Sequence, residues 1–211
     1  MPIYTRRGDN GQTSLRDGTK ISKSSCHSEV IGNLDELITE LGFILCTYDN
    51  NIKETNTTEV SFLYDFELKF IEDIQLKLFE IGTLIANPSN NKRFDKVFDI
   101  DDVYTVNLEQ RINTMDDKLP RLKNFILMQG NIQMMYCNKA RVLCRRFERS
   151  LISHINESDS NFLKTNCSKY MNRLSDYLFT LSRFIGYCCK IPEKVIMSSG
   201  ECKTYIDINS T

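Results

Sequence analysis

The fold is decided by the stretch Cys137-Asn-Lys-Ala-Arg-Val-Leu-Cys-Arg-Arg-Phe-Glu-Arg-Ser-Leu151. Successive residues of an α-helix turn by about 100°, so the small and apolar members of this stretch share one arc. That arc consists of Cys137, Ala140, Cys144, Phe147, Leu151 and, one turn further on, Ile155. An apolar arc beside a charged one is typical of a helix that packs into a bundle core, and we predict a helix over about 131–157.

Four more segments carry apolar residues at helical spacing. One starts at about residue 28 and carries Val30, Leu34, Leu37, Leu41 and Leu45; another covers about 60–86 and carries Phe62, Phe66, Phe70, Ile74, Leu78 and Ile81. The others cover about 100–115, with Val103, Val106, Leu108 and Ile112, and about 161–190, with Leu174, Leu178, Leu181 and Ile185. Five helices without β-α-β alternation favour an all-α protein, a five-helix bundle with ferritin-like up-and-down packing.

The predicted bundle, residues 28–190, leaves a flank at each end of a chain of 211 residues, a length that fits one domain over 1–211. Residues 1–25 are rich in glycine and hydroxyl side chains and contain Asp17-Gly18, a turn signal that predicts a short hairpin. Residues 191–211 are predicted to form an irregular or extended tail. Leu119–Gly130 is predicted to connect two helices with a few extended residues.

Composition excludes several classes of protein. The 27 Lys and Arg nearly balance the 28 Asp and Glu, for a formal charge of −1, which argues against a nucleic-acid coat or a protein held to membranes by bulk charge. No apolar run reaches the ~18–20 residues of a membrane span, and residues 1–10 lack a secretory signal. We therefore expect a cytoplasmic protein with no nucleic-acid or membrane partner, or a mitochondrial one if a targeting segment has been removed.

The eight cysteines and two histidines form no recognisable metal site. There is no Cys-x-x-Cys, and Cys and His do not alternate at metal-ligand spacing. We expect reduced structural thiols and no metal held by protein side chains.

Charged side chains gather beside the apolar arc of the 131–157 helix. Arg141, Arg145 and Arg149 fall within about 100° of one another, together with Glu148. Guanidinium groups this close repel one another unless anions lie between them. A solvated charged face would explain the pattern, and so would a phosphate site, because a guanidinium binds phosphate oxygens bidentately.

Two further polar patterns also have both a structural and a functional interpretation. One face of the 161–190 helix carries Asn172, Asp176, Phe179 and Arg183. It is either an exposed face or the polar wall of a pocket in which Asp176 orients one of the arginines. Asp35 lies between Gly32 and Gly42, where another helix can approach and receive a salt bridge; a simple exposed Asp fits equally well.

The run from Tyr4 to Ser14 contains two glycines, hydroxyl side chains and two arginines. Gly8 and Gly11 permit positive φ, so that consecutive N–H groups can converge on phosphate oxygens. Because no Gly-Lys-Ser/Thr follows, the run is not a Walker A loop, and glycine-rich hairpins without a ligand are also common.

Five segments together resemble one family, the PduO-type ATP:cob(I)alamin adenosyltransferases. They are Thr5–Thr13, Gly32–Leu37, Phe125–Leu127, Ala140–Arg149 and Asn172–Phe179. Their order and spacing are similar to the family's and cover nearly the whole chain. The resemblance implies a homotrimer with active sites between neighbouring subunits. It also implies transfer of the 5′-deoxyadenosyl group of ATP to the cobalt of cob(I)alamin, which yields adenosylcobalamin and triphosphate.

The resemblance further implies roles for individual residues. The triphosphate would be wrapped by Thr5, Arg6, Arg7, Gly8, Thr13 and Ser14, with Lys23 adding a charge; the ATP site would be completed by Arg145, Arg146, Glu148, Arg149 and Asn172. Asp35 would pair with Arg141 across a subunit boundary, and Asp176 would lie on that corrinoid side. Phe125 would lie beneath the corrin and exclude the lower axial ligand. Arg145, Phe125 and Asp35 would act most directly in catalysis, and Mg²⁺ would bridge phosphate oxygens.

The chain departs from the family's pattern on the corrinoid side. Met128-Gln129 follows Phe-Ile-Leu where Pro-Gly is common, and Asn138 stands where a His is common. The first hypothesis is an active enzyme that receives cobalamin from a cobalamin reductase and supplies an adenosylcobalamin-dependent mutase. Two alternatives therefore stay open. One is a non-catalytic carrier of ATP and corrinoid, and the other is a trimeric structural or regulatory protein that retains the fold.

Overall fold

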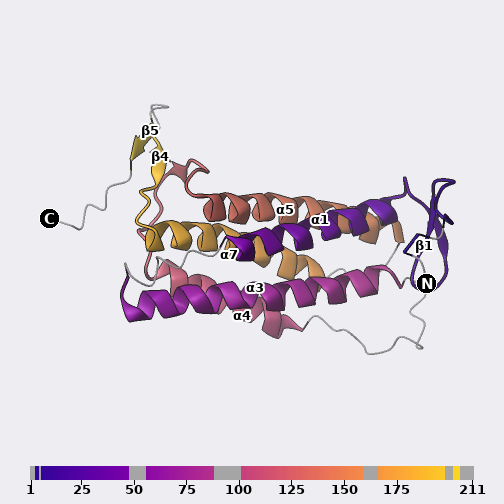
Figure 1. Cartoon of the computed structure of the whole chain (residues 1–211), viewed down its shortest axis with the longest axis horizontal. Helices are drawn as coiled ribbons and strands as arrows, with labels where there is room; N and C mark the ends of the chain where they lie inside the picture. The colour runs from indigo at the N-terminus through magenta and orange to yellow at the C-terminus, as the bar shows by residue number, and fades with distance from the viewer. Residues whose placement is uncertain are drawn as a thin grey trace.

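The computed structural model describes residues 3–4, 6–47, 56–87, 101–158, 166–197 and 202–204. Its helices are α1 (Cys26–Cys46), α3 (Thr58–Ile85), α4 (Asp102–Asp116), α5 (Ile132–Ser158) and α7 (Asn166–Cys188). Its strands are β1 (Gln12–Ser14), β2 (Lys20–Ser22), β3 (Phe125–Ile126), β4 (Lys194–Ile196) and β5 (Cys202–Thr204). The helices run side by side as a bundle (Figure 1), which confirms the predicted all-α fold.

The core forms where α5 packs between α1 and α7, and where α4 packs on α7. Every member of the predicted apolar arc of α5 is buried, from Cys137 to Ile155. The predicted stripe of α1 is buried from Val30 to Leu41, while Leu45 is partly buried at its end. The four predicted core leucine and isoleucine positions of α7 are also buried.

The predicted apolar stripe of α3 is wrong in its first half. Phe62 is 71% exposed and Phe66 is 46% exposed, whereas Tyr64 and Ile71 are fully buried. Phe62 lies nine residues before Ile71, a rotation of about 180° at 100° per residue, so it points away from the core. Tyr64 enters the core because its hydroxyl donates to Gln133 Oε1 at 2.7 Å.

The predicted stripe of α4 is also partly wrong. Val103 and Val106 are exposed, and Leu108 lies in the core with Thr105 and Met115. Thr105 and Leu108 are one turn apart and therefore share a face, whereas Val103 and Val106 lie toward the far side of the helix at about 100° per residue. The helix buries fewer of its apolar residues than its sequence suggests.

The N-terminal hairpin forms where Asp17-Gly18 predicts it. Strands β1 and β2 pair in antiparallel fashion, with Thr13 opposite Ile21. Gly18 has a φ of 91°, a value that glycine adopts without strain, and the amide of Thr19 donates to Asp17 Oδ1 at 2.8 Å. The chain enters α1 through the N-cap Ser25, whose hydroxyl accepts from the amide of Ser28.

The opposite end of the bundle carries a small three-stranded sheet in the order β3-β4-β5. Phe125 pairs with Ile196, and Ile126 pairs with Val195. The described parts of the tail, Lys194–Ile196 and Cys202–Thr204, are thus extended, as predicted, and β4 pairs with the short strand of the Leu119–Gly130 connection. In Figure 1 the β1 hairpin and the β4–β5 strands lie at opposite ends of the helices.

All eight cysteines are free thiols, as the sequence predicts. Burial raises the pKa of the Cys188 thiol to about 12, and it raises the pKa values of Cys137 and Cys144 still further. None of the described helices combines the length and apolar character needed to cross a bilayer.

Candidate functional site

The charged face of α5 is a ridge of four arginines, Arg141, Arg145, Arg146 and Arg149, which we call the arginine ridge. Arg145 and Arg149 are exposed and have no ion-pair partner among the described residues. Arg146 forms an ion pair with Glu36 of α1. Three of the four guanidinium groups therefore lack a compensating carboxylate within the described part of the chain.

Two buried N–H donors on the arginine ridge have neither a hydrogen-bond partner nor an ion-pair partner in the described structure. They are Nε of Arg141 and Nε of Arg146. Burial lowers the pKa of Arg141, and the positive charge of Arg145 lowers it further. Buried donors are almost always satisfied in folded proteins, so this ridge has the donors and the excess charge that an anion would satisfy.

The polar face of α7 meets the arginine ridge at one point. Asn172 Nδ2 lies 3.5 Å from Glu148 Oε1, so the amide and the carboxylate adjoin each other. Further along α7, Asp176 accepts a hydrogen bond from Arg173 Nη1 at 2.7 Å. The arginine that Asp176 orients within the chain is therefore Arg173, which lies on the same helix. Asn172 and Asp176 are exposed.

Arg183 belongs to the same predicted face but is buried, at 5% exposure. Its Nε donates to Glu193 at 2.6 Å, and its Nη2 donates to the carbonyl of Pro120 at 2.7 Å. A third partner, Asp116, lies 3.5 Å from Nη1. The alternative of an exposed face is therefore wrong for Arg183, which is held in a buried ion pair and lines a pocket together with Phe179.

Asp35 does not pair with Arg141 within one chain. Asp35 is exposed, and no ion pair between described residues includes it. The neighbouring acidic residues of α1 do pair with α5, Glu36 with Arg146 and Glu40 with Lys139. Asp35 and the unsatisfied Nε of Arg141 thus both stay available for a contact outside the chain.

The N-terminal loop forms an open hollow lined by Arg7, Gly8, Gln12, Thr13, Ser14 and Lys20. Lys23 points toward it, since its Nζ lies 3.2 Å from the place a Cβ on residue 8 would occupy. Gly11 has a φ of 74°, and its carbonyl accepts from the amide of Lys23 at 2.9 Å. Arg6 is described and exposed, whereas Thr5 lies outside the described residues.

The hairpin and the arginine ridge do not meet within the chain. Glu36, which pairs with Arg146, lies ten residues into α1, about 15 Å along the axis from the end that joins the hairpin. Figure 1 shows the hairpin beyond that end of the bundle. No hydrogen bond or ion pair between described residues connects the two.

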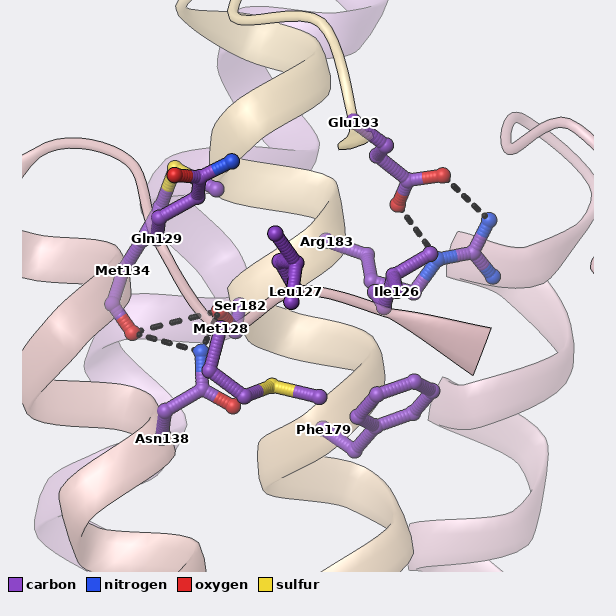
Figure 2. A pocket seen from close by; sticks show the side chains of 10 residues that line it. All are labelled: Ile126, Leu127, Met128, Gln129, Met134, Asn138, Phe179, Ser182, Arg183 and Glu193. Carbon is purple, nitrogen blue, oxygen red and sulfur yellow. Dashed lines mark hydrogen bonds and ion pairs between the residues drawn. The ribbon is translucent and has the colours of Figure 1, made fainter. Parts of the chain in front are cut away.

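Phe125 lies at the other end, on β3, with 85% of its side chain exposed. Beneath this strand is a pocket lined by Ile126, Leu127, Met128, Gln129, Met134, Asn138, Phe179, Ser182, Arg183 and Glu193 (Figure 2). Asn138 donates to Ser182 Oγ at 2.7 Å and to the carbonyl of Met134 at 3.1 Å, while its Oδ1 is buried without a partner among the described residues. The departures Met128-Gln129 and Asn138 therefore meet in one pocket.

Sequence reasoning missed three of these contacts. The ion pairs Glu36–Arg146 and Glu40–Lys139 join two helices, and the bonds of Arg183 join a helix to two loops. Glu36 and Glu40 lie one turn apart on α1, a spacing that signals a shared face. The sequence contains no comparable signal for the partners of Arg183.

Comparisons with known proteins agree with the family that the sequence resembles. The family model for cobalamin adenosyltransferase matches residues 3–185. The corrinoid adenosyltransferase MMAB of Homo sapiens is 31% identical over 204 residues, which is 93% of this chain and 74% of the human protein. The corrinoid adenosyltransferase PduO of Citrobacter freundii is 32% identical over 87% of this chain and 49% of that protein.

Solved structures give the same result. A variant of a PduO-type ATP:corrinoid adenosyltransferase from Lactobacillus reuteri, complexed with cobalamin and ATP, superposes with a TM-score of 0.78 and 27% identity. The match covers 92% of this chain and 98% of that one. Another variant from the same organism, complexed with the same ligands, has a TM-score of 0.80 at 26% identity, over 97% of this chain and the whole of that one.

Proposed function

This chain belongs to the cobalamin adenosyltransferase family, and from that premise we propose that it transfers the 5′-deoxyadenosyl group of ATP to the cobalt of cob(I)alamin. Co(I) attacks C5′ and forms the Co–C bond, while the C5′–O bond breaks and triphosphate leaves with its electron pair. Because Co(I) is itself a strong nucleophile, the protein needs no nucleophilic side chain. Its task is to position C5′ in line with cobalt and to stabilise charge on the leaving group.

The observation that carries this proposal is the arginine ridge with its unsatisfied donors. Arg145 and Arg149 would bind triphosphate oxygens from the exposed face, and Nε of Arg141 and Arg146 would be satisfied by the nucleotide or by a neighbouring chain. Glu148 and Asn172 adjoin the ridge, where they would orient the nucleoside. Mg²⁺ would enter with ATP as part of the substrate, held by phosphate oxygens.

We propose that the site is completed by a second copy of the chain in a homotrimer. The N-terminal loop of the neighbouring subunit would close over the triphosphate. Its residues would be Arg6, Arg7, Gly8, Thr13, Ser14 and Lys23, together with Thr5, which lies outside the described residues. Two observations support this arrangement. No hydrogen bond or ion pair joins the hairpin to the ridge among the described residues, and neither Asp35 nor Nε of Arg141 has a partner among them. Sedimentation at three times the chain mass of 24.5 kDa is the expected result.

The corrinoid would lie against Phe125, with Asp176 on the same side of the assembly. An exposed apolar ring offers cobalt no lower ligand, and the loss of that ligand makes Co(II) easier to reduce. Both histidines of the chain are elsewhere: their rings lie 4.5 Å apart, and His27 Nε2 contacts the carbonyl of Ile85 at 2.8 Å. We propose a cytoplasmic reaction in which a cobalamin reductase supplies the electron and a mutase takes the product.

The direct test mixes the purified protein with MgATP, cob(II)alamin and a reductant and follows the visible spectrum. We expect the bands of adenosylcobalamin to grow in step with the release of triphosphate. Lys69→Ala, which removes an exposed charge on α3 away from the ridge, serves as the matched control for Arg145→Ala. A wild-type protein that binds ATP yet never forms a Co–C bond would contradict the proposal.

A second candidate function, a non-catalytic carrier, is favoured by the pocket beneath β3. Met128, Gln129 and Asn138 alter the support of Phe125 and leave Asn138 Oδ1 without a partner. A carrier would bind both ATP and cobalamin in calorimetry while the spectrum stays that of the unreacted corrinoid. A protein that binds neither would instead be a structural or regulatory trimer.

A further inference from the structure

Arg183 is a buried charged residue with several polar partners at the β3–β5 end of the bundle, and it has no role in the proposed reaction. It lies in the last third of α7, away from the arginine ridge of α5. Its guanidinium is held on two sides by Glu193, at 2.6 Å from Nε and 3.3 Å from Nη2. Figure 2 shows this bidentate pair at the rim of the pocket beneath β3.

Arg183 binds the two chain segments that lead into β3, the strand of Phe125, and into β4, the strand that pairs with β3. Pro120, whose carbonyl accepts from Nη2, starts the connection to β3. Glu193 directly precedes β4, the strand that pairs with β3. Asp116, at 3.5 Å, is the last residue of α4. One side chain thus joins the end of α4, the entry to β3 and the entry to β4.

The Phe125 strand has little other support. β3 is two residues long, and among the described strands it pairs only with β4. Beyond the two pairs of the register, the amide of Leu127 donates to the carbonyl of Lys194 at 2.8 Å, and Asn124 Nδ2 lies 3.5 Å from the sulfur of Met197. The ring of Phe125 is 85% exposed and therefore gains almost no packing of its own. Its position depends on where β4 and the Pro120 connection are fixed.

We propose that Arg183 is a positioning residue for the corrinoid site, which acts through β3 and β4 to fix the height and tilt of Phe125. The inference rests on the proposed function, because Phe125 matters only if a corrin lies on it. The planar fork of arginine holds Glu193 and the Pro120 carbonyl at once. Lysine has the same charge but no such fork, so Arg183→Lys should release one of the two segments.

A direct measurement of Phe125 is available because the chain contains no tryptophan. Phe125→Trp places a single tryptophan on β3, which can be excited at wavelengths where the nine tyrosines do not absorb. Its anisotropy decay reports the mobility of that strand, and iodide quenching reports its exposure, without any substrate. In this background we expect Arg183→Lys and Glu193→Gln to increase the amplitude of the fast phase of the anisotropy decay. Arg111→Lys disturbs another Arg–Glu pair, in which Arg111 Nη1 lies 3.1 Å from the buried Glu67, and should leave the anisotropy unchanged. Between described residues, Arg111 has no hydrogen bond or ion pair with β3 or β4.

The catalytic readout uses chains with the natural Phe125. We expect Arg183→Lys to raise KM for cobalamin by roughly 10- to 100-fold, since misplacement of about 1 Å costs up to 10²-fold, with KM for ATP changed less than twofold. The spectrum of bound cob(II)alamin should shift from the four-coordinate toward the five-coordinate form. Glu193→Gln, which keeps a neutral partner at the same place, should have a smaller effect in the same direction.

Three results would overturn the proposal. They are unchanged tryptophan mobility in a folded Arg183→Lys chain, an equal rise of both KM values, and an equal effect of Arg111→Lys. If the wild-type chain forms no adenosylcobalamin, the proposed function fails, but the tryptophan measurement still decides whether Arg183 fixes β3. If the Arg183→Lys chain loses its helical circular-dichroism signal, the tryptophan mobility and the KM values of the Glu193→Gln chain alone test the proposal.

Discussion

Arg145→Ala separates chemistry from packing on α5. Arg145 is exposed, lies off the apolar arc and has no ion-pair partner in the described structure. Its removal should therefore change the free energy of unfolding by no more than about 0.5 kcal/mol. If it binds the triphosphate, the variant loses a charge-assisted hydrogen bond of about 1.5–3 kcal/mol, which corresponds to a Kd for ATP weaker by about 10- to 150-fold.

Isothermal titration of MgATP into the corrinoid-free protein measures this Kd, and urea unfolding followed by circular dichroism measures the stability. Lys69→Ala controls for the loss of one positive charge from an exposed helical position and should change Kd less than twofold. The reasoning is refuted if Arg145→Ala binds ATP like the wild type. It is also refuted if Lys69→Ala weakens binding equally, because net charge alone would then explain the effect.

Three more predictions follow from particular side chains. Asp35→Ala should weaken the trimer in sedimentation velocity while leaving the helical signal intact, and Asp35→Arg combined with Arg141→Asp should restore assembly; a stable trimer of the single variant would count against the pairing. Phe147→Ala should lower the free energy of unfolding by about 3–5 kcal/mol, because Phe147 is fully buried; a loss below 1 kcal/mol in urea unfolding would contradict its place in the core. Burial first, and then the charge of His27, lowers the pKa of His154 below its usual 6.5, so the unfolded chain binds more protons and stability should fall as pH drops below about 6.5. Thermal unfolding at pH 7.5 and 5.5 tests this, and His154→Gln should flatten the dependence; a wild-type melting temperature that does not fall at pH 5.5 would contradict it.

Predictions from local chemistry were confirmed. The apolar arc from Cys137 to Ile155 needed only the period of a helix, and Asp17-Gly18 needed only the turn geometry that glycine permits. Both signals are complete within a few residues of sequence. The fold class followed from them because each helix with one apolar face must find another.

Predictions that depend on distant partners failed or were missed. Phe62 and Phe66 carry as much apolar surface as the buried Tyr64, and only the position of the neighbouring helices decides which side faces the core. The exposed-face alternative failed for Arg183, because Glu193 and the Pro120 carbonyl enclose its guanidinium from beyond the end of its helix. Neither partner can be recognised from spacing along α7.

The separation of the hairpin from the arginine ridge has a genetic consequence. If every reaction centre takes its loop from one protomer and its ridge from the next, a lesion in Arg7 and a lesion in Arg145 spoil different halves of a centre. Mixed assemblies of the two defective chains would contain some centres that carry both lesions and others that carry neither. Two alleles that are inactive alone would then complement each other when they are expressed together.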